Sequence, residues 1–160
     1  ASKQDPDDND ADEPATTSTT RPKALAAKSP VLPQTRVVKA NDGSCLDVSN
    51  AQSLNEQEIQ ATACNGTAAQ VWTLATDKTF QALDKCLQAY THVSGKPSVQ
   101  LYDCSASAIQ RWKMSGKTVV NADSGLCLTM GGIDGGYGGG TQLSLSTCTG
   151  RATQRWTLAG

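Results

Sequence analysis

Three tripeptides of one pattern, glutamine–any residue–tryptophan, recur along this chain. Successive copies lie 40 and 44 residues apart, and an internal period of that length predicts three copies of one structural unit. The tripeptides contain the only tryptophans of the chain and begin with three glutamines: Trp72, Trp112 and Trp156, preceded by Gln70, Gln110 and Gln154.

The six cysteines follow the same period. Although six cysteines allow 15 pairings, the repeat favours the same closure in every unit. The predicted disulfides are Cys45–Cys64, Cys86–Cys104 and Cys127–Cys148. A zinc site is not expected, because there is no Cys-x2-Cys or Cys-x4-Cys spacing and His92 is the only histidine. Disulfides indicate an oxidising compartment, so we expect a secreted or cell-surface protein.

Each unit contains four short segments in which apolar and polar residues alternate, separated by clusters of Gly, Asn, Asp, Ser and Pro. This pattern predicts β-strands, and no helical period of useful length is present. We therefore expect an all-β domain over residues 34–160. It would hold about twelve strands in three repeats, at about 34–75, 76–115 and 116–160.

Residues 1–33 have a different composition, first rich in aspartate and then in threonine, serine and proline, with no aromatic residue. Such a segment buries too little apolar surface to offset its ordering entropy, so we expect a disordered tail or linker. The chain begins with Ala1 rather than methionine, which suggests a processed product whose tail is a stalk or a remnant of cloning.

Several function classes are disfavoured by the composition. The formal net charge of −1 and the lack of a Lys/Arg run argue against nucleic-acid binding. No apolar stretch approaches the ~20 residues of a transmembrane helix. With a single histidine and oxidised cysteines, we expect no catalytic site, no metal and no cofactor.

The three Gln-x-Trp motifs, in step with three cysteine pairs, resemble the ricin-B-type lectin domain over about residues 34–160. The resemblance implies a β-trefoil, a fold with pseudo-threefold symmetry. The tryptophans would then pack near the axis with Leu46, Leu87 and Leu128, and the glutamines would satisfy buried backbone groups. The motifs are thus expected to be structural.

The resemblance also implies one shallow sugar pocket per unit, built from an aspartate, an aromatic residue and a polar residue. Here the aspartate position holds Asp47, Gln88 and Thr129, the aromatic position holds Thr62, Tyr102 and Ser146, and the polar position holds Ala69, Ile109 and Thr153. No unit retains all three residue types, so the pockets are expected to be partly degenerate.

Two units retain part of a pocket. In the first, the Asp47 carboxylate would accept hydrogen bonds from sugar hydroxyls, and Asn65 would make a further contact to the sugar. The alternative is that Asp47 is simply a solvated strand residue. In the second, the Tyr102 ring would stack on a sugar beside Gln88, unless it packs as an ordinary half-buried strand residue. Tyr90 and His92 would widen that second pocket. Asn65 also begins an Asn-Gly-Thr glycosylation sequon.

The third unit carries a glycine-rich stretch over residues 131–140. Within it, Asp134 and Tyr137 offer a carboxylate and a ring away from the usual positions. They would form a replacement binding loop, or else the stretch is a tolerated insertion.

Together these features predict a secreted carbohydrate-binding module with weak single-site affinity that directs a carrier protein to glycan or polysaccharide. The alternative is a degenerate lectin fold that binds protein, as an inhibitor or accessory subunit. A purely structural spacer is the third reading.

Overall fold

A computed structural model describes residues 34–133 and 140–159 of the chain. These residues form twelve antiparallel β-strands, and the only helices among them are four 3-10 turns. The all-β architecture and the four strands per repeat are confirmed. The tail of residues 1–33 lies outside the described residues.

The strands divide equally among the repeats. The first unit holds β1 (Gln34–Ala40), β2 (Cys45–Val48), β3 (Gln57–Thr62) and β4 (Trp72–Leu74). The second holds β5 (Phe80–Ala82), β6 (Lys85–Thr91), β7 (Pro97–Tyr102) and β8 (Trp112–Ser115). The third holds β9 (Thr118–Asn121), β10 (Cys127–Met130), β11 (Thr141–Ser146) and β12 (Trp156–Ala159). The 3-10 turns are η2 (Ser49–Ala51), η3 (Ala68–Gln70), η4 (Ala108–Gln110) and η5 (Ala152–Gln154).

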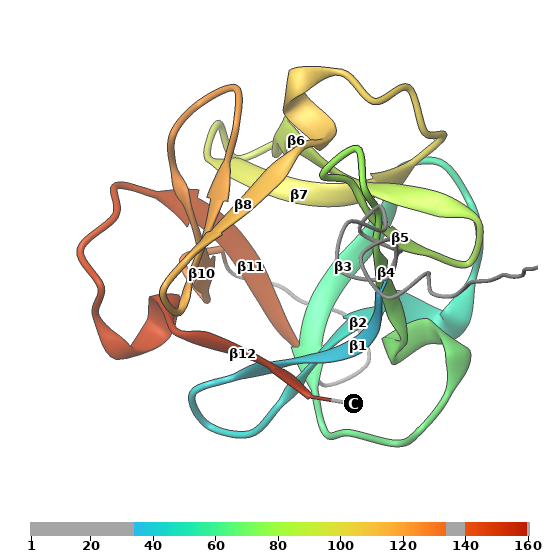
Figure 1. Cartoon of the computed structure of the whole chain (residues 1–160). Coiled ribbons are helices and arrows are strands. Elements are labelled where there is room, and N and C mark those ends of the chain that lie inside the picture. The colour runs from blue at the N-terminus through green and yellow to red at the C-terminus, as the bar shows by residue number, and fades with distance from the viewer. Residues whose placement is uncertain (1–33, 134–139, 160) are drawn as a thin grey trace, which may run out of the picture. The chain divides into compact units, whose positions relative to one another are not determined.

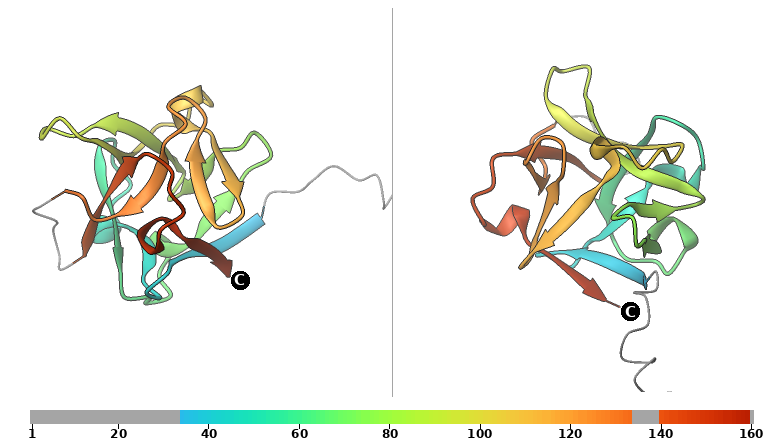
Figure 2. Two further views of the ribbon diagram at one scale, coloured as in Figure 1. Left: turned by 90° about the vertical axis from the view of Figure 1, so that its left-hand side faces the viewer. Right: turned by 45° about the horizontal axis from the view of Figure 1, so that its top comes forward.

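Six strands form a ring, and the three units are arranged around a common centre (Figure 1). Strand β1 pairs with β12 and β4, β4 pairs with β5, and β8 pairs with β9. A bridge between Thr79 and Arg111 joins β5 to β8, and a bond from the Trp156 amide to the Lys117 carbonyl joins β12 to β9. Both views of Figure 2 show the first and last strands side by side, where the ring closes.

The other six strands form three hairpins, β2–β3, β6–β7 and β10–β11. The hairpins meet through β3, which pairs with both β7 and β11. The Ser98 hydroxyl on β7 also donates to the Leu143 carbonyl on β11 at 2.6 Å. A ring of six strands with three interlocked hairpins is a β-trefoil, the fold that the resemblance implies.

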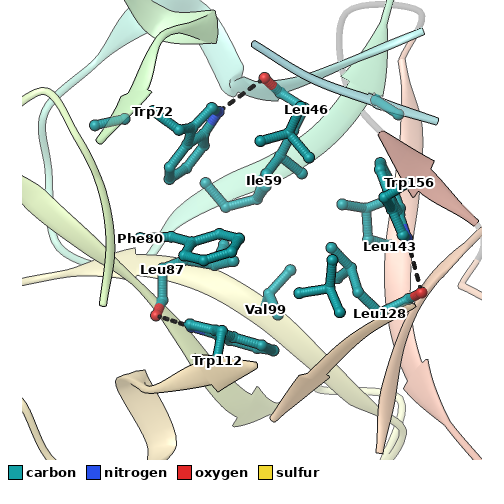
Figure 3. Packing of buried hydrophobic residues seen from close by; sticks show 14 of the residues in the cluster. Leu46, Ile59, Trp72, Phe80, Leu87, Val99, Trp112, Leu128, Leu143 and Trp156 are labelled. Atoms are coloured by element: carbon teal, nitrogen blue, oxygen red, sulfur yellow. Dashed lines mark hydrogen bonds between the residues drawn. The ribbon is translucent and has the colours of Figure 1, made fainter. Parts of the chain in front are cut away.

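The hydrophobic core lies where the three units meet, and its largest members are the three tryptophans (Figure 3). Each indole is almost fully buried, and each Nε1–H donates at 3.0 Å to the carbonyl of the leucine that follows the first cysteine of its unit. The pairs are Trp72–Leu46, Trp112–Leu87 and Trp156–Leu128. The indoles therefore bury large apolar area and leave no donor unsatisfied.

The glutamine of each tripeptide is buried and bonds the backbone on both sides of the second cysteine. In the third unit Gln154 Oε1 accepts from the Thr149 amide at 2.7 Å, and its Nε2 donates to the Thr147 carbonyl at 2.8 Å. Gln70 and Gln110 make the equivalent bonds around Cys64 and Cys104. Each glutamine thus fixes the segment that carries one end of a disulfide.

The three disulfides join the predicted partners. Cys45–Cys64, Cys86–Cys104 and Cys127–Cys148 span 19, 18 and 21 residues, and no cysteine is free. Closing a loop of this length stabilises the fold by roughly 3 kcal/mol in the chain-entropy model. One disulfide per unit therefore reinforces each hairpin at its open end.

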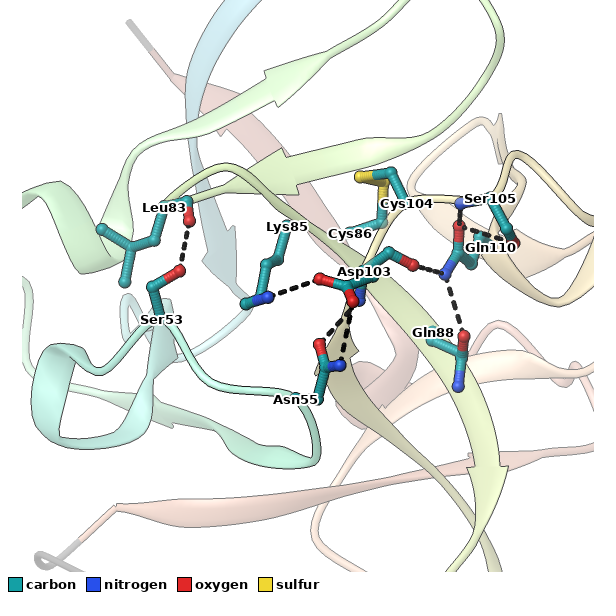
Figure 4. Close-up of polar contacts among 10 residues, drawn as sticks. All are labelled: Ser53, Asn55, Leu83, Lys85, Cys86, Gln88, Asp103, Cys104, Ser105 and Gln110. Atoms are coloured by element: carbon teal, nitrogen blue, oxygen red, sulfur yellow. Dashed lines mark hydrogen bonds and ion pairs between the residues drawn. A yellow bond between two sulfur atoms is a disulfide. The ribbon is translucent and has the colours of Figure 1, made fainter.

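A polar contact holds the loop of the first unit against the second (Figure 4). Asn55 and Asp103 exchange two hydrogen bonds, and the Lys85 ammonium pairs with the Asp103 carboxylate. Nearby, the Ser53 hydroxyl donates to the Leu83 carbonyl at 2.6 Å. The hydrogen bonds from Lys85 and then Asn55 lower the pKa of Asp103 below its ordinary value.

We predict that replacing a tripeptide glutamine destabilises the fold. In Gln154→Leu the amides of Thr149 and Gly150 and the carbonyl of Thr147 lose their partner. The expected loss in unfolding free energy is about 2–4 kcal/mol, measured by urea denaturation. Arg155→Gln changes the exposed neighbour and serves as the control, with an effect within about 0.5 kcal/mol. Equal stability of the two variants would contradict a bonding role for the glutamine.

We also predict an acid-sensitive contribution from the Asp103 contact. Because the folded-state pKa of Asp103 is depressed, its contribution is present above about pH 4 and is lost as the pH falls below that value. Asp103→Asn should therefore flatten the decline in the urea midpoint between about pH 5 and pH 2. Asp123→Asn removes another exposed carboxylate as the control, and an equal flattening there would refute the assignment to Asp103.

Candidate functional site

The three hairpins present corresponding residue pairs on the face that points away from the core. Residues directly opposite on antiparallel strands share a face, so each hairpin places its two side chains together. The pairs are Asp47 with Gln60, Gln88 with Gln100, and Thr129 with Ser144. The same position in the fold therefore carries a carboxylate–amide, an amide–amide and a hydroxyl–hydroxyl pair.

Asp47 in the first unit is a nearly buried carboxylate, 5% exposed. Its Oδ2 accepts a hydrogen bond from Gln60 Nε2 at 2.8 Å. Among the residues that the structure describes, no Lys, Arg or His forms an ion pair with it, since the ion pair found there joins Lys85 and Asp103. The carboxylate is oriented by a neutral amide and keeps its capacity to accept further hydrogen bonds.

Gln60 is itself buried, and close packing fixes its side chain. A Cβ added at Gly140 would lie 2.2 Å from Gln60 Oε1, so a larger residue at position 140 would require the Gln60 amide to move. Gln60 Oε1 has no hydrogen-bond partner among the described residues, and its Nε2 donates to Asp47. The end of the glycine-rich stretch of the third unit therefore supports a residue pair of the first.

The other candidate positions of the first unit are less open to a ligand. Asn65 is exposed, but its Oδ1 already accepts from the amide and hydroxyl of Thr67, at 3.0 and 2.7 Å. Its side-chain NH2 group makes no hydrogen bond to another described residue and stays available. Ala69 is 2% exposed and offers no polar atom from its side chain, whereas Thr62 is half-buried.

In the second unit Gln88 is tied to the tripeptide glutamine (Figure 4). Gln110 Nε2 donates to Gln88 Oε1 at 2.8 Å, so Gln88 directs its NH2 group outward. This position therefore offers hydrogen-bond donors where a carboxylate would offer acceptors. Ile109, at the polar position of the same unit, is half-buried and apolar.

Tyr102 lies on the same strand face as Gln88 and Gln100, two residue pairs further along the hairpin. Its ring is half-buried, and Tyr90 is on this face at the other side of the glutamine pair. The His92 ring packs edge-on against Tyr90, with centroids 6.4 Å apart. Burial, helped by the charge of Glu58, raises the pKa of Tyr90. Two aromatic side chains therefore flank an amide pair.

The third unit contains a pocket of about 460 Å³. Thr129, Ser146 and Thr153, which occupy the aspartate, aromatic and polar positions of this unit, all line it. The sequence indicated neither a carboxylate nor a ring here and therefore assigned no ligand-binding residue to these positions. The structure brings their three hydroxyls together around an open space.

Two basic residues that sequence analysis did not select also line this pocket. Lys96 comes from the β6–β7 hairpin of the second unit, and its Nζ donates to the Gly132 carbonyl at 2.7 Å. Arg151 immediately precedes η5, where the corresponding residues of the other units are Thr67 and Ser107. An arginine at a position where the other two units have a small hydroxyl residue could have identified Arg151 from the sequence. Lys96 could not be found in this way, because it reaches the pocket from another unit.

Two other predicted residues, Asp134 and Tyr137, lie outside the described residues. Within the described part of the chain there is no cluster of three or more His, Cys, Asp or Glu side chains arranged to hold a metal. Nor does that part contain a helix with the length and apolar character of a membrane span.

The comparisons with known proteins agree with this architecture. The family model of the ricin-type beta-trefoil lectin domain matches residues 33–156. Ribosome-inactivating protein SNAI of Sambucus nigra is 34% identical over 131 residues, which cover 80% of this chain and 21% of that protein. Beta-galactoside-specific lectin 3 of Viscum album is 32% identical over 133 residues, covering 80% and 22%. The chain thus spans about a fifth of the length of these relatives.

Among solved structures, the agglutinin from Abrus precatorius superposes with a TM-score of 0.68 at 31% identity, over 82% of this chain and 49% of that one. The family match covers most of the chain, and the fold, the tripeptides and the disulfides follow the same threefold pattern. The chain belongs to the ricin-type β-trefoil lectin domain family.

Proposed function

We propose that this domain binds carbohydrate through the outer faces of its hairpins, with Asp47 as the principal acceptor of sugar hydroxyls. The observation that carries the proposal is the nearly buried Asp47 carboxylate, oriented by one amide with no cation paired to it in the described residues. A carboxylate in such a position is costly unless hydrogen-bond donors reach it. Adjacent sugar hydroxyls are donors that would form charge-assisted hydrogen bonds.

The second unit offers an aromatic ring and hydrogen-bond donors to a sugar, where the first unit offers a carboxylate acceptor. The half-buried Tyr102 ring offers an apolar face, and the outward NH2 group of Gln88 offers donors to hydroxyl or ring oxygens. The ring and the amide lie on one strand face, which suits a sugar stacked on Tyr102. Asn65 is proposed as a secondary donor in the first unit.

Each site is expected to be weak, in the millimolar range that a few hydrogen bonds and one stacking contact provide. Two weak sites on one domain gain retention on a polymeric or clustered glycan through avidity. Galactosides are the first probes, because a relative from Viscum album is named as a β-galactoside-specific lectin.

We further propose that the domain is secreted and directs a carrier protein to glycan. Three disulfides suit an oxidising compartment. In SNAI the matched region makes up only 21% of the protein, so the domain is one part of a larger relative there. The Thr/Ser/Pro-rich segment within residues 1–33 is proposed as the linker.

Asp47→Asn tests the principal site. The variant keeps the shape of the side chain and an oxygen for Gln60, but it removes the charge. We expect galactoside affinity at this unit to fall about five- to tenfold. The unfolding free energy should be unchanged or higher, because a desolvated charge is removed. The measurement is a two-dimensional NMR titration of the labelled full chain with methyl β-galactoside and lactose.

The control for Asp47→Asn is Asp84→Asn, which removes an exposed carboxylate from the turn before β6. It should leave the titration unchanged. Unaltered binding in Asp47→Asn, with shifts still clustered around β2 and β3, would exclude Asp47 as the acceptor.

Tyr102→Ala and Tyr102→Phe together test the second site. Loss of the ring in the alanine variant should weaken the response of β6 and β7 to sugar by roughly fivefold or more, whereas phenylalanine should retain most of it. Tyr90→Phe, on the same face, is the matched control for loss of a hydroxyl. If the alanine variant binds sugar with the same affinity as the unmodified chain, the proposal that a sugar stacks on Tyr102 is wrong.

A titration that shows no shifts with any sugar would contradict the proposed function. The degenerate lectin that binds protein would then become the leading alternative, to be pursued by affinity capture in the presence of excess sugar.

A further inference from the structure

We propose that the pocket of the third unit binds an acidic saccharide, one that carries a carboxylate or sulfate group. The inference rests on the proposed carbohydrate-binding function and specifies its ligand class at a position that the other two sites do not share. It follows from the charge and the hydrogen-bonding groups of the pocket lining.

The described part of the pocket lining carries positive charge. Lys96 and Arg151 line it from two different units, and none of the described residues around it is acidic. Both cations are exposed, and neither forms an ion pair with another described residue. Two positive charges beside one pocket therefore remain available to an anion, whereas a neutral sugar would leave them unused.

The Arg151 guanidinium is positioned by neutral hydroxyls. Its Nε donates to Thr153 Oγ1 at 3.0 Å, and its Nη1 donates to Thr149 Oγ1 at 3.2 Å. Its Nη2 lies 3.5 Å from Ser146 Oγ, at the limit of a hydrogen bond. These contacts hold the planar group at the pocket without neutralising it. A guanidinium presents several donors in one plane, which matches the geometry of a carboxylate or a sulfate.

The pocket also contains groups that recognise the rest of a sugar. Thr129 Oγ1 and Ser146 Oγ lie 2.8 Å apart, and both accept from Gln154 Nε2 at 3.2 Å. The Thr129 hydroxyl donates to the Cys127 carbonyl at 2.9 Å, so Ser146 Oγ donates to Thr129 Oγ1 and both hydroxyls are bonded within the protein. The exposed Thr153 hydroxyl accepts from Arg151 and keeps its own proton available to donate. Thus the charge of the ligand would be recognised at Lys96 and Arg151, and a ring hydroxyl at Thr153, next to the bonded pair Thr129 and Ser146.

This chemistry is the opposite of that in the first unit. There the corresponding pair is Asp47 with Gln60, and the residue that corresponds to Arg151 is the neutral Thr67. A carboxylate on a sugar would be repelled by Asp47 but attracted by the third-unit pocket. Acidic and neutral sugars should therefore bind at different places on the same domain.

The experiment compares matched neutral and acidic sugars by NMR titration of the labelled full chain. The pairs are methyl β-glucoside with methyl β-glucuronide, and galactose with galactose 6-sulfate. We expect the acidic member to shift the amides of Thr129, Ser146 and Thr153 and to bind about fivefold more tightly there than its neutral partner. This preference should diminish as salt is added, because the cations are exposed. The two pairs show whether carboxylate or sulfate is preferred.

Arg151→Gln and Lys96→Gln should each remove most of the preference for the acidic sugar. Arg155→Gln and Lys117→Gln, at exposed positions outside the pocket lining, are the matched controls and should retain it. All four positions are on the surface, and preserved amide dispersion in the spectrum confirms folding of each variant.

Equal affinity for the neutral and acidic members at the third unit would overturn the inference. So would an unchanged preference in Arg151→Gln. If inorganic sulfate alone gives the same shifts at the same affinity, the pocket is an anion site that does not recognise sugar, which also refutes the proposal. Neutral galactosides that bind around Asp47 while acidic sugars leave Thr129 and Ser146 unaffected would refute this inference and leave the proposed function intact.

Discussion

The hydrogen bonds that the three tripeptide glutamines make to the backbone hold each unit of this fold together. Each glutamine bonds the peptide groups on both sides of a disulfide cysteine, while the tryptophan two residues later bonds the leucine next to the other cysteine of that disulfide. The disulfide, the hairpin and the core therefore share one set of contacts. Because those contacts use backbone atoms, the outward side chains of the hairpins can vary without loss of the fold.

The same glutamines connect the fold to the candidate sites, but not equally. Gln110 also reaches Gln88, and Gln154 also reaches Thr129, so the outer positions of the second and third units are tied to the structural contacts. In the first unit Asp47 is held instead by its cross-strand neighbour Gln60. The acceptor there is oriented by a residue that makes no contribution to the apolar core, which separates its role from that of the fold.

The features that belong to the repeated fold could be predicted from the sequence, whereas the contacts that differ between units could not. The strands, the disulfides and the buried tryptophans were predictable because they repeat, and a repeat is visible without coordinates. The pocket of the third unit was not, since Lys96 reaches it from another unit and no periodic pattern reports such a contact. The packing of Gly140 on Gln60 was hidden for the same reason. The sequence shows which residue types stand at the three expected pocket positions of each unit, but it does not show which other residues lie beside them.

The different residues at the outward position of the three hairpins have a common physical explanation. In each hairpin the residue before and the residue after the outward position face the core, as Leu87 and Ala89 do around Gln88, so core packing constrains those neighbours. The outward residue contributes little to the apolar core, so its chemistry differs between units even where, as at Gln88 and Thr129, it also bonds a tripeptide glutamine. A carboxylate, an amide beside a ring, and hydroxyls beside two cations are three outcomes at one position of the fold. Threefold symmetry of the backbone therefore does not require threefold symmetry of the ligands, and the proposed binding of chemically mixed glycans through several weak and unlike contacts depends on that difference.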